Sequence, residues 1–259
     1  MTLNLLKIFE YMNAKKNSHL TKTPISGLTC SNCLVRATCP SPNKADEAIE
    51  ELSAIIERNK STVQKGAIIY QAGDEFKNLY AIRSGSVKIY SINEQGDEQI
   101  TSFHMSGDLI GFDAIADNEH LSFAQSLETT SISEIPFTEI MHLAAQKPCL
   151  NLHLLKLIST EISTKKNLMM MISKQTAEQR LTSFLLHLYK NLARRNLAGQ
   201  EIKLTMTRYE IGNYISLTVE TISRLLTKLR KEQIIEVHGR YISILDIDKL
   251  HRILQGNLL

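Results

Sequence analysis

Residues 205–245 read TMTRYEIGNYISLTVETISRLLTKLRKEQIIEVHGRYISIL and determine the architecture of the C-terminal part of the chain. Thr207 is followed three residues later by Glu210, a capping-box pattern that predicts the start of a short helix. Thr218 is placed to cap a second helix that reaches about Lys231. Two short helices joined by so short a connection are typical of a helix-turn-helix.

The end of the same stretch predicts a β-hairpin. Two short apolar runs, 234–237 and 241–245, are joined by His238, Gly239 and Arg240. A glycine in a short connection between two β-like runs is typical of a hairpin turn. Together with the two helices, this hairpin predicts a winged helix-turn-helix.

The second of the two helices carries chemistry suited to the major groove of DNA. Arg224 has the planar guanidinium that binds O6 and N7 of guanine together, and Glu220 can accept from the amino group of cytosine. Both lie in the first two turns, the part of a recognition helix that reaches base edges. An ion pair between these two residues, four apart, is the alternative interpretation. The candidate DNA-contacting residues are Thr218, Glu220, Thr221, Ser223 and Arg224, and the expected buried face is Val219, Ile222, Leu226 and Leu229.

The charge distribution points to the same partner. Residues 178–259 hold 13 Lys and Arg against 8 Asp and Glu, a net charge of +5. The other 177 residues hold 17 against 19, a net charge of −2. A basic C-terminal part beside a mildly acidic remainder indicates a polyanion as partner for the former.

Glycines recur at regular intervals in the middle of the chain. From residue 63 to 137, turn-forming pairs such as Gly73-Asp74 and Gly96-Asp97 separate short apolar runs at intervals of about 11 residues. This spacing favours an all-β roll or jelly roll over βαβ units.

Helical periodicity replaces this pattern after Pro136. Glycine is absent from residues 139–178, and apolar residues spaced by threes and fours predict one long helix. A helix from 149 to 175 would be roughly 40 Å long. Its stripe is Leu150, Leu154, Ile158, Ile162, Lys165, Met169 and Ile172, and its candidate dimer contacts are Leu154, Ile158, Ile162, Lys165 and Met169.

A long helix with one continuous seam usually packs against a second copy of itself. Packing against its own β domain is the alternative. Lys165 would face its symmetry mate, so the charges either reach water along extended stems or weaken the dimer.

These patterns predict an α+β chain. Its parts are an N-terminal extension with a cysteine loop (1–45), a β-roll (46–146), a dimerisation helix (147–178) and a winged helix-turn-helix (179–259). No run of 18 uncharged apolar residues occurs, so a membrane span is not expected, and the chain reads as cytoplasmic.

Three of the four cysteines lie within ten residues. Cys30, Cys33 and Cys39 have the spacing C-x2-C-x5-C, and the fourth is Cys149. Three thiolates on one short loop can converge on a soft metal centre. Zinc is the usual alternative, although no second C-x2-C pair follows. Cys149 alone is as well explained as a small buried residue.

The helix-turn-helix stretch also resembles a known family. LTMTRYEIGNYISLTVETISRLL (204–226) is similar to the DNA-binding motif of the CRP/FNR superfamily, specifically its FNR branch, the fumarate and nitrate reduction regulators. The resemblance continues through YAIRSGSVKIYSINEQGDEQITSFHMSGDLIGFDAI (80–115) and covers about residues 30–245. The E-x-x-S-R pattern at Glu220, Ser223 and Arg224 is similar to that of FNR proteins reading TTGAT-type half-sites.

The resemblance implies a β-roll like that of cyclic-nucleotide-binding domains and a homodimer that binds palindromic double-stranded DNA. It also implies contact with RNA polymerase through the turn Gly96, Asp97 and Glu98. It further implies that Cys30, Cys33 and Cys39, with one distant cysteine, hold an oxygen-labile [4Fe–4S] cluster.

The chain departs from the family at the fourth cluster ligand. The position before Glu134-Ile135-Pro136-Phe137, a cysteine in the family, is Ser133 here. Either Cys149 replaces the missing ligand, or the sensing chemistry has been lost and the protein is zinc-bound or constitutive.

Two function classes are disfavoured. In the cyclic-nucleotide branch an Arg-Ser pair holds the cyclic phosphate, and the matching residues here are Leu121 and Ser122. No Lys or Arg occurs in residues 107–146, so a buried anion would lack a partner and no cyclic nucleotide is expected. The common catalytic motifs G-x-G-x-x-G, P-loop, H-E-x-x-H and G-x-S-x-G are absent, and an enzyme is not expected.

Overall fold

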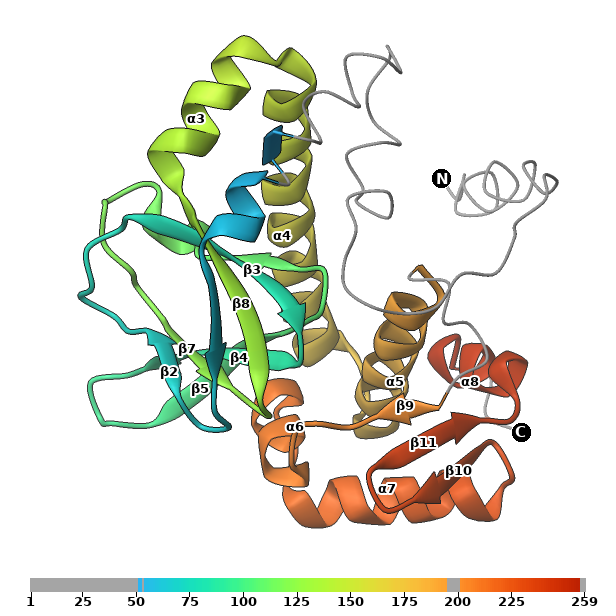
Figure 1. The fold of residues 1–259 in the computed structure, drawn as a ribbon. Helices are drawn as coiled ribbons and strands as arrows, with labels where there is room; N and C mark the ends of the chain where they lie inside the picture. Colours follow the sequence, from blue (N-terminus) through green and yellow to red (C-terminus); the bar gives the residue numbers. More distant parts are fainter. Residues whose placement is uncertain (1–50, 53, 195–200, 257–259) are drawn as a thin grey trace, which may run out of the picture.

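A computed structural model describes residues 51–52, 54–194 and 201–256 of the chain. These residues form a β-roll, a long helix and a winged helix-turn-helix, as the sequence predicts (Figure 1). The winged helix-turn-helix lies beside one end of the β-roll, and the long helix α4 runs along the roll toward it (Figure 1).

The β-roll consists of two antiparallel four-stranded sheets. The first has the order β1 (Lys60–Val63), β8 (Thr130–Pro136), β3 (Asn78–Ser84) and β6 (Leu109–Ile110). The second has the order β2 (Ile68–Tyr70), β7 (Phe123–Ser126), β4 (Ser86–Ile92) and β5 (Glu98–Met105). A short 3₁₀ helix, Phe112–Ala114, follows β6. Because β5 is the last strand in the order of the second sheet, it is an edge strand.

Two apolar clusters lie on either side of the first sheet. One of them joins the two sheets through Ile82, Val87 and Ala124. The other packs Leu79 and Ile135 of the first sheet against the helical residues 51–52 and 54–58, α3 (Phe137–Gln146) and α4 (Pro148–Lys174). Helices thus cover the outer face of the first sheet. The β5 edge belongs to the second sheet and is left for contact with another part of the molecule.

The long helix begins with Pro148 at its first position, where a missing N–H costs nothing. Its boundaries, Pro148–Lys174, agree with the predicted 149 to 175. Lys147 breaks the helical run, so α3 and α4 are separate helices. The backbone places Cys149 in the first turn of α4.

The C-terminal part contains α5 (Ala177–Arg194), α6 (Arg208–Ile215), α7 (Val219–Lys231) and α8 (Ile247–Leu254). The predicted hairpin is β10 (Ile235–His238) and β11 (Tyr241–Ile244), and β9 (Ile202–Lys203) adds a third strand. Its apolar core is continuous with Tyr90, Ile100 and Leu127 of the β-roll. The two parts of the protomer therefore share one hydrophobic cluster.

All six glycines that mark turns in the roll have φ between +84° and +100°. These conformations are strained for residues with a Cβ, which explains the regular glycine spacing. At Gly85, between β3 and β4, a Cβ would also lie 2.5 Å from Thr130 Oγ1 and 2.8 Å from Thr130 Cα.

We expect Gly85→Ala to destabilise the protein by about 1–3 kcal/mol more than Gly66→Ala, because overpacking adds to backbone strain only at Gly85. Gly66 is a matched control, since its φ is +84° and no atom lies within 4 Å of the position that a Cβ would take there. Equilibrium unfolding in urea measures both. Equal losses would contradict the predicted steric conflict with Thr130.

Candidate nucleic-acid interface

The helix-turn-helix is fixed by local hydrogen bonds that the sequence predicts. Thr207 and Glu210 form a complete capping box at the start of α6. Ser216 ends α6 in the left-handed conformation, with φ 56°, and Thr218 caps α7 by accepting from the N–H of Thr221. A Cβ on Gly212 would lie 2.3 Å from the carbonyl oxygen of Leu217, so only glycine permits this tight turn.

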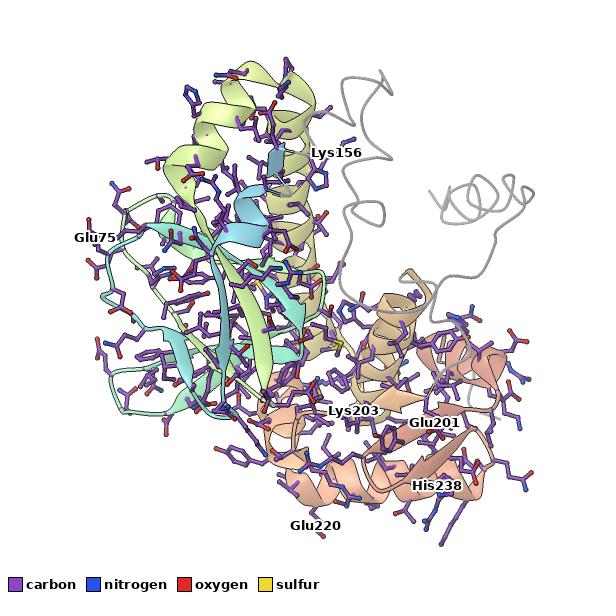
Figure 2. All side chains as sticks on the ribbon, in the orientation of Figure 1. Glu75, Lys156, Glu201, Lys203, Glu220 and His238 are labelled. Atoms are coloured by element: carbon purple, nitrogen blue, oxygen red, sulfur yellow. The ribbon has the colours of Figure 1, made fainter. Side chains whose placement is uncertain are left out.

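The candidate base-reading residues lie on the outward face of α7. Glu220 and Arg224 are exposed, and Figure 2 shows Glu220 pointing away from the protein. Among the described residues no ion pair joins Glu220 to Arg224, so the alternative of a helix-surface pair gains no support. Ser223 donates to the carbonyl of Val219 at 2.8 Å and accepts from Arg208 Nη1 at 2.9 Å.

The expected buried face of α7 needs one correction. Ile222, Leu226 and Leu229 are buried, but Val219 is 44% exposed and Leu225 is buried. Val219 is the first residue of the helix, where the turn from α6 leaves its side chain outside the core. Val219 therefore lies on the surface beside Glu220.

Positive charge gathers at the far end of α7. Lys228, Arg230 and Lys231 lie in its last turn, where cations are favoured by the helix dipole. Lys228 Nζ lies 2.8 Å from Glu178 Oε1 of α5, and this hydrogen bond raises the pKa of Lys228. The pair ties α7 to α5.

The long helix α4 changes its environment along its length. Leu150 and Leu154 are buried in the protomer's own core, so here the alternative interpretation of packing on the β-roll is correct. Further along, Leu155, Ile162 and Met169 are 58%, 64% and 72% exposed. Leu154 therefore does not belong to the exposed seam. The seam residues, spaced alternately by three and four, are Leu155, Ile158, Ile162, Lys165, Met169 and Ile172.

In the β-roll, Asp113 contacts Ser122, the residue that matches the serine of the Arg-Ser pair in the cyclic-nucleotide branch. Ser122 Oγ donates to Asp113 Oδ2 at 2.7 Å, and the Leu121 N–H donates to the same oxygen at 3.2 Å. His120 Nδ1 lies 3.4 Å from Asp113 Oδ1, and its ring stacks on Tyr70 at 3.8 Å. Because a carboxylate already accepts from Ser122, the site is unfavourable for a cyclic phosphate.

The candidate cluster ligands lie mostly outside the described residues. Cys30, Cys33 and Cys39 belong to the part that is not described, and of Cys149 only the backbone is described. Ser133, at the family's fourth ligand position, is completely buried on β8, and its hydroxyl has no hydrogen-bond partner within the described chain. Among the described residues no group of three His, Cys, Asp or Glu side chains could hold a metal ion.

The candidate polymerase-contacting turn connects β4 to β5. Gly96 has φ +87°, and Asp97 accepts from the side chain of Asn93 at 3.2 Å. Glu98 turns inward and pairs with Lys88 at 2.7 Å. Burial opposes the charge of Lys88, but Glu98 and then Glu210 outweigh it, so the pKa of Lys88 is raised.

Sequence reasoning missed three features of these sites. Arg208 reaches Ser223 from another helix, and no local pattern shows this. Asp113 lies nine residues from its partner Ser122. Leu155 could have been found, since it lies one heptad before Ile162.

None of the described helices is both long and apolar enough to cross a membrane.

Comparisons with known proteins agree with this geometry. Residues 60–147 match the cyclic nucleotide-binding domain family, and residues 179–253 match the Crp-like helix-turn-helix domain family. The chain is 46% identical over 221 residues to the fumarate and nitrate reduction regulatory proteins of Salmonella typhimurium and Escherichia coli. The match covers 85% of this chain and 88% of each relative.

Among solved structures, FixK2 from Bradyrhizobium japonicum has a TM-score of 0.69 at 27% identity, covering 75% of this chain and 96% of FixK2. A CooA mutant from Carboxydothermus hydrogenoformans shares the fold, with a TM-score of 0.63 at 20% identity, over 78% of this chain and 90% of CooA. The chain therefore belongs to the CRP/FNR superfamily, and within it to the fumarate and nitrate reduction regulators, which are DNA-binding transcription regulators.

Proposed function

We propose that the protein is a homodimer whose two α7 helices read the half-sites of a palindromic DNA sequence similar to TTGAT. The observation that carries this proposal is the outward position of Glu220, Ser223 and Arg224 on the first half of α7. These residue types can bind cytosine and guanine edges in the major groove. Thr218 and Thr221, whose hydroxyls lie 2.9 Å apart at the helix start, would face the DNA backbone.

The dimer is formed in this proposal by the exposed seam of α4. Apolar side chains at alternating spacings of three and four match the pattern of a two-stranded coiled coil. Lys165 lies within the seam and pairs with Glu161 at 3.4 Å on its own helix. Two such lysines facing one another would make the dimer weaker and therefore adjustable.

The regulatory input we propose is oxygen, through a [4Fe–4S] cluster held by Cys30, Cys33, Cys39 and Cys149. The buried, unpartnered Ser133 hydroxyl is a harder and less acidic ligand than a thiol, which favours a thiolate from elsewhere as the fourth ligand. Cys149 lies in the first turn of α4, where the helix N-terminus favours negative charge. When bound, the cluster would supply oxygen sensitivity.

A bound regulator must also reach RNA polymerase. The exposed turn at Gly96 and Asp97 leads into β5, whose first residue, Glu98, accepts a hydrogen bond from Asn213 of the DNA-binding module through its carbonyl. We propose this turn, with Glu98 behind it, as the surface that contacts polymerase.

Arg224→Ala should weaken binding to the preferred palindrome by about 1–3 kcal/mol and relax the preference at one base pair, because a bidentate contact to guanine is lost. Fluorescence anisotropy against duplexes substituted at each position measures this change. Arg252→Ala, which removes an equal charge from α8, is the control and should leave the base preference intact. An equal loss for every sequence would make Arg224 a phosphate contact.

Ile162→Glu should shift the protein toward monomer, because it places a charge in the middle of the apolar seam. Lys165→Leu should shift the protein toward dimer, because it removes the repulsion between the two Lys165 side chains. Sedimentation equilibrium of both variants measures the change. Met141→Glu alters a similarly exposed apolar residue on α3 and should have no effect. A monomeric wild-type protein under anaerobic conditions would contradict the proposed dimer.

Cys149→Ser should abolish cluster retention after anaerobic reconstitution, and adding Ser133→Cys should restore it, because a fourth thiolate is again present. Iron and sulfide counts with the visible absorption spectrum measure retention. A Cys149→Ser variant that holds the cluster as well as the wild type would exclude Cys149. A colourless wild-type protein with stoichiometric zinc would exclude the cluster itself.

A further inference from the structure

The open edge of strand β5 is completed by a side chain from the DNA-binding module. An edge strand leaves unpaired N–H and C=O groups. Asn213 of α6 fills this gap at two points: its Nδ2 donates to the carbonyl of Glu98 at 2.7 Å, and its Oδ1 accepts from the Ile100 N–H at 2.6 Å. A side-chain amide has the same donor and acceptor as a peptide group, so Asn213 takes the place of a neighbouring strand.

Further contacts join α6 to β5 and to the neighbouring strand β4. Gln99 Nε2 donates to the Asn213 carbonyl at 3.0 Å. Glu210, three residues before Asn213 and thus on the same helix face, lies 3.4 Å from Lys88 Nζ. Tyr214 packs edge-to-face on Phe103 of β5, with ring centroids 5.1 Å apart. Hydrogen bonds and an aromatic contact therefore hold α6 against β5, and an ion pair holds it against the neighbouring strand β4.

The packing of α4 against α5 and α6 is less complete than the packing of α6 against the β-roll. An open cavity of about 420 Å³ lies between α4, α5 and α6, lined by residues that include Met171, Phe184 and Tyr214. Only Gln175 and Thr176 separate the end of α4 from the start of α5. The long helix thus connects to the DNA-binding module through a short joint beside a space that the protomer does not fill.

Holding α6 also holds the recognition helix. The Leu217 N–H donates to the Gly212 carbonyl at 2.8 Å, and this close backbone contact ties the end of α6 to the turn that leads into α7. On the β-roll side of the contact with Asn213, Glu98 belongs to the turn that is proposed to contact RNA polymerase. One face of α6 therefore connects that turn to Glu220, Ser223 and Arg224 on α7.

We infer that Asn213 is a positioning residue that sets the direction of the recognition helix relative to the β-roll. This inference rests on the proposed dimeric DNA binding, in which two such helices must meet major grooves about 34–36 Å apart. A protomer that lost the Asn213 contact would still present a complete helix-turn-helix, but the two helices of a dimer would no longer be held at one separation.

The test compares a palindrome with a single half-site, using the full-length wild-type protein and Asn213→Asp. Aspartate keeps an acceptor for the Ile100 N–H but loses the donor to Glu98 and adds a charge near two carboxylates. We expect affinity for the palindrome to fall about tenfold, because one hydrogen bond is lost and the added charge is repelled by the nearby carboxylates. Affinity for the half-site should stay within about twofold, and palindromes with one base pair inserted or deleted should be discriminated less sharply.

Equal losses on palindrome and half-site would overturn the inference, since Asn213 would then support only the fold of the module. Unchanged palindrome affinity would overturn it as well. Asn59→Asp adds the same charge at an exposed position before β1 and should alter neither affinity. Should Asn213→Asp fail to fold, Gln99→Ala removes the hydrogen bond to the Asn213 carbonyl, together with the bond from Gln99 to the Ile100 carbonyl within β5, and should give a weaker form of the same pattern. A wild-type protein that binds no palindrome would instead refute the proposed function.

Discussion

The burial of Leu150 and Leu154 against the first sheet fixes the direction of α4, and the rest of the molecule depends on that direction. Because the start of α4 is anchored in the β-roll, its remaining turns are aligned by a rigid support. The exposed Leu155, Ile162 and Met169 are then presented as one stripe. A dimer formed through this stripe inherits its geometry from the core of the roll.

The second constraint is the shared core between the β-roll and the winged helix-turn-helix. Tyr90 and Ile100 of the roll belong to the same cluster as Phe184 and Tyr214 of the DNA-binding part. Burial raises the pKa of Tyr214 to about 12, so its ring and hydroxyl remain neutral. Lys88, at 8% side-chain exposure between Glu98 and Glu210, adds a buried ion network. The desolvation of these charged groups offsets much of their mutual attraction, so the network adds little net stability.

The β-roll keeps the topology of a ligand-binding domain while its polar centre is occupied by its own residues. Asp113 accepts from Ser122 and approaches His120, whose ring stacks on Tyr70. Burial, followed by the nearby Asp113, raises the pKa of Tyr70. The polar groups of this region are thus directed at one another, and the roll acts as a scaffold that links α4 to α6.

Much of this protein follows from local sequence. The capping box at Thr207, the glycine turns and the period of α4 each depend on residues close in the chain, whose backbone preferences are strong. The candidate base-reading face of α7 also follows from the order of Glu220, Ser223 and Arg224. Local pattern alone misplaced Val219 and Leu154, because which face of a helix is buried depends on what packs against it.

Only the tertiary structure decided the contacts between distant residues. Asn213 and Ile100 are 113 positions apart, and their hydrogen bond exists because a helix lies along an edge strand. Arg208 with Ser223 and Asp113 with Ser122 are also products of packing. Sequence periodicity predicts which helices and strands form, because it reflects which residues are buried and which backbone conformations they allow. The position of one element on another depends on shape and unpaired polar groups, which no single segment contains.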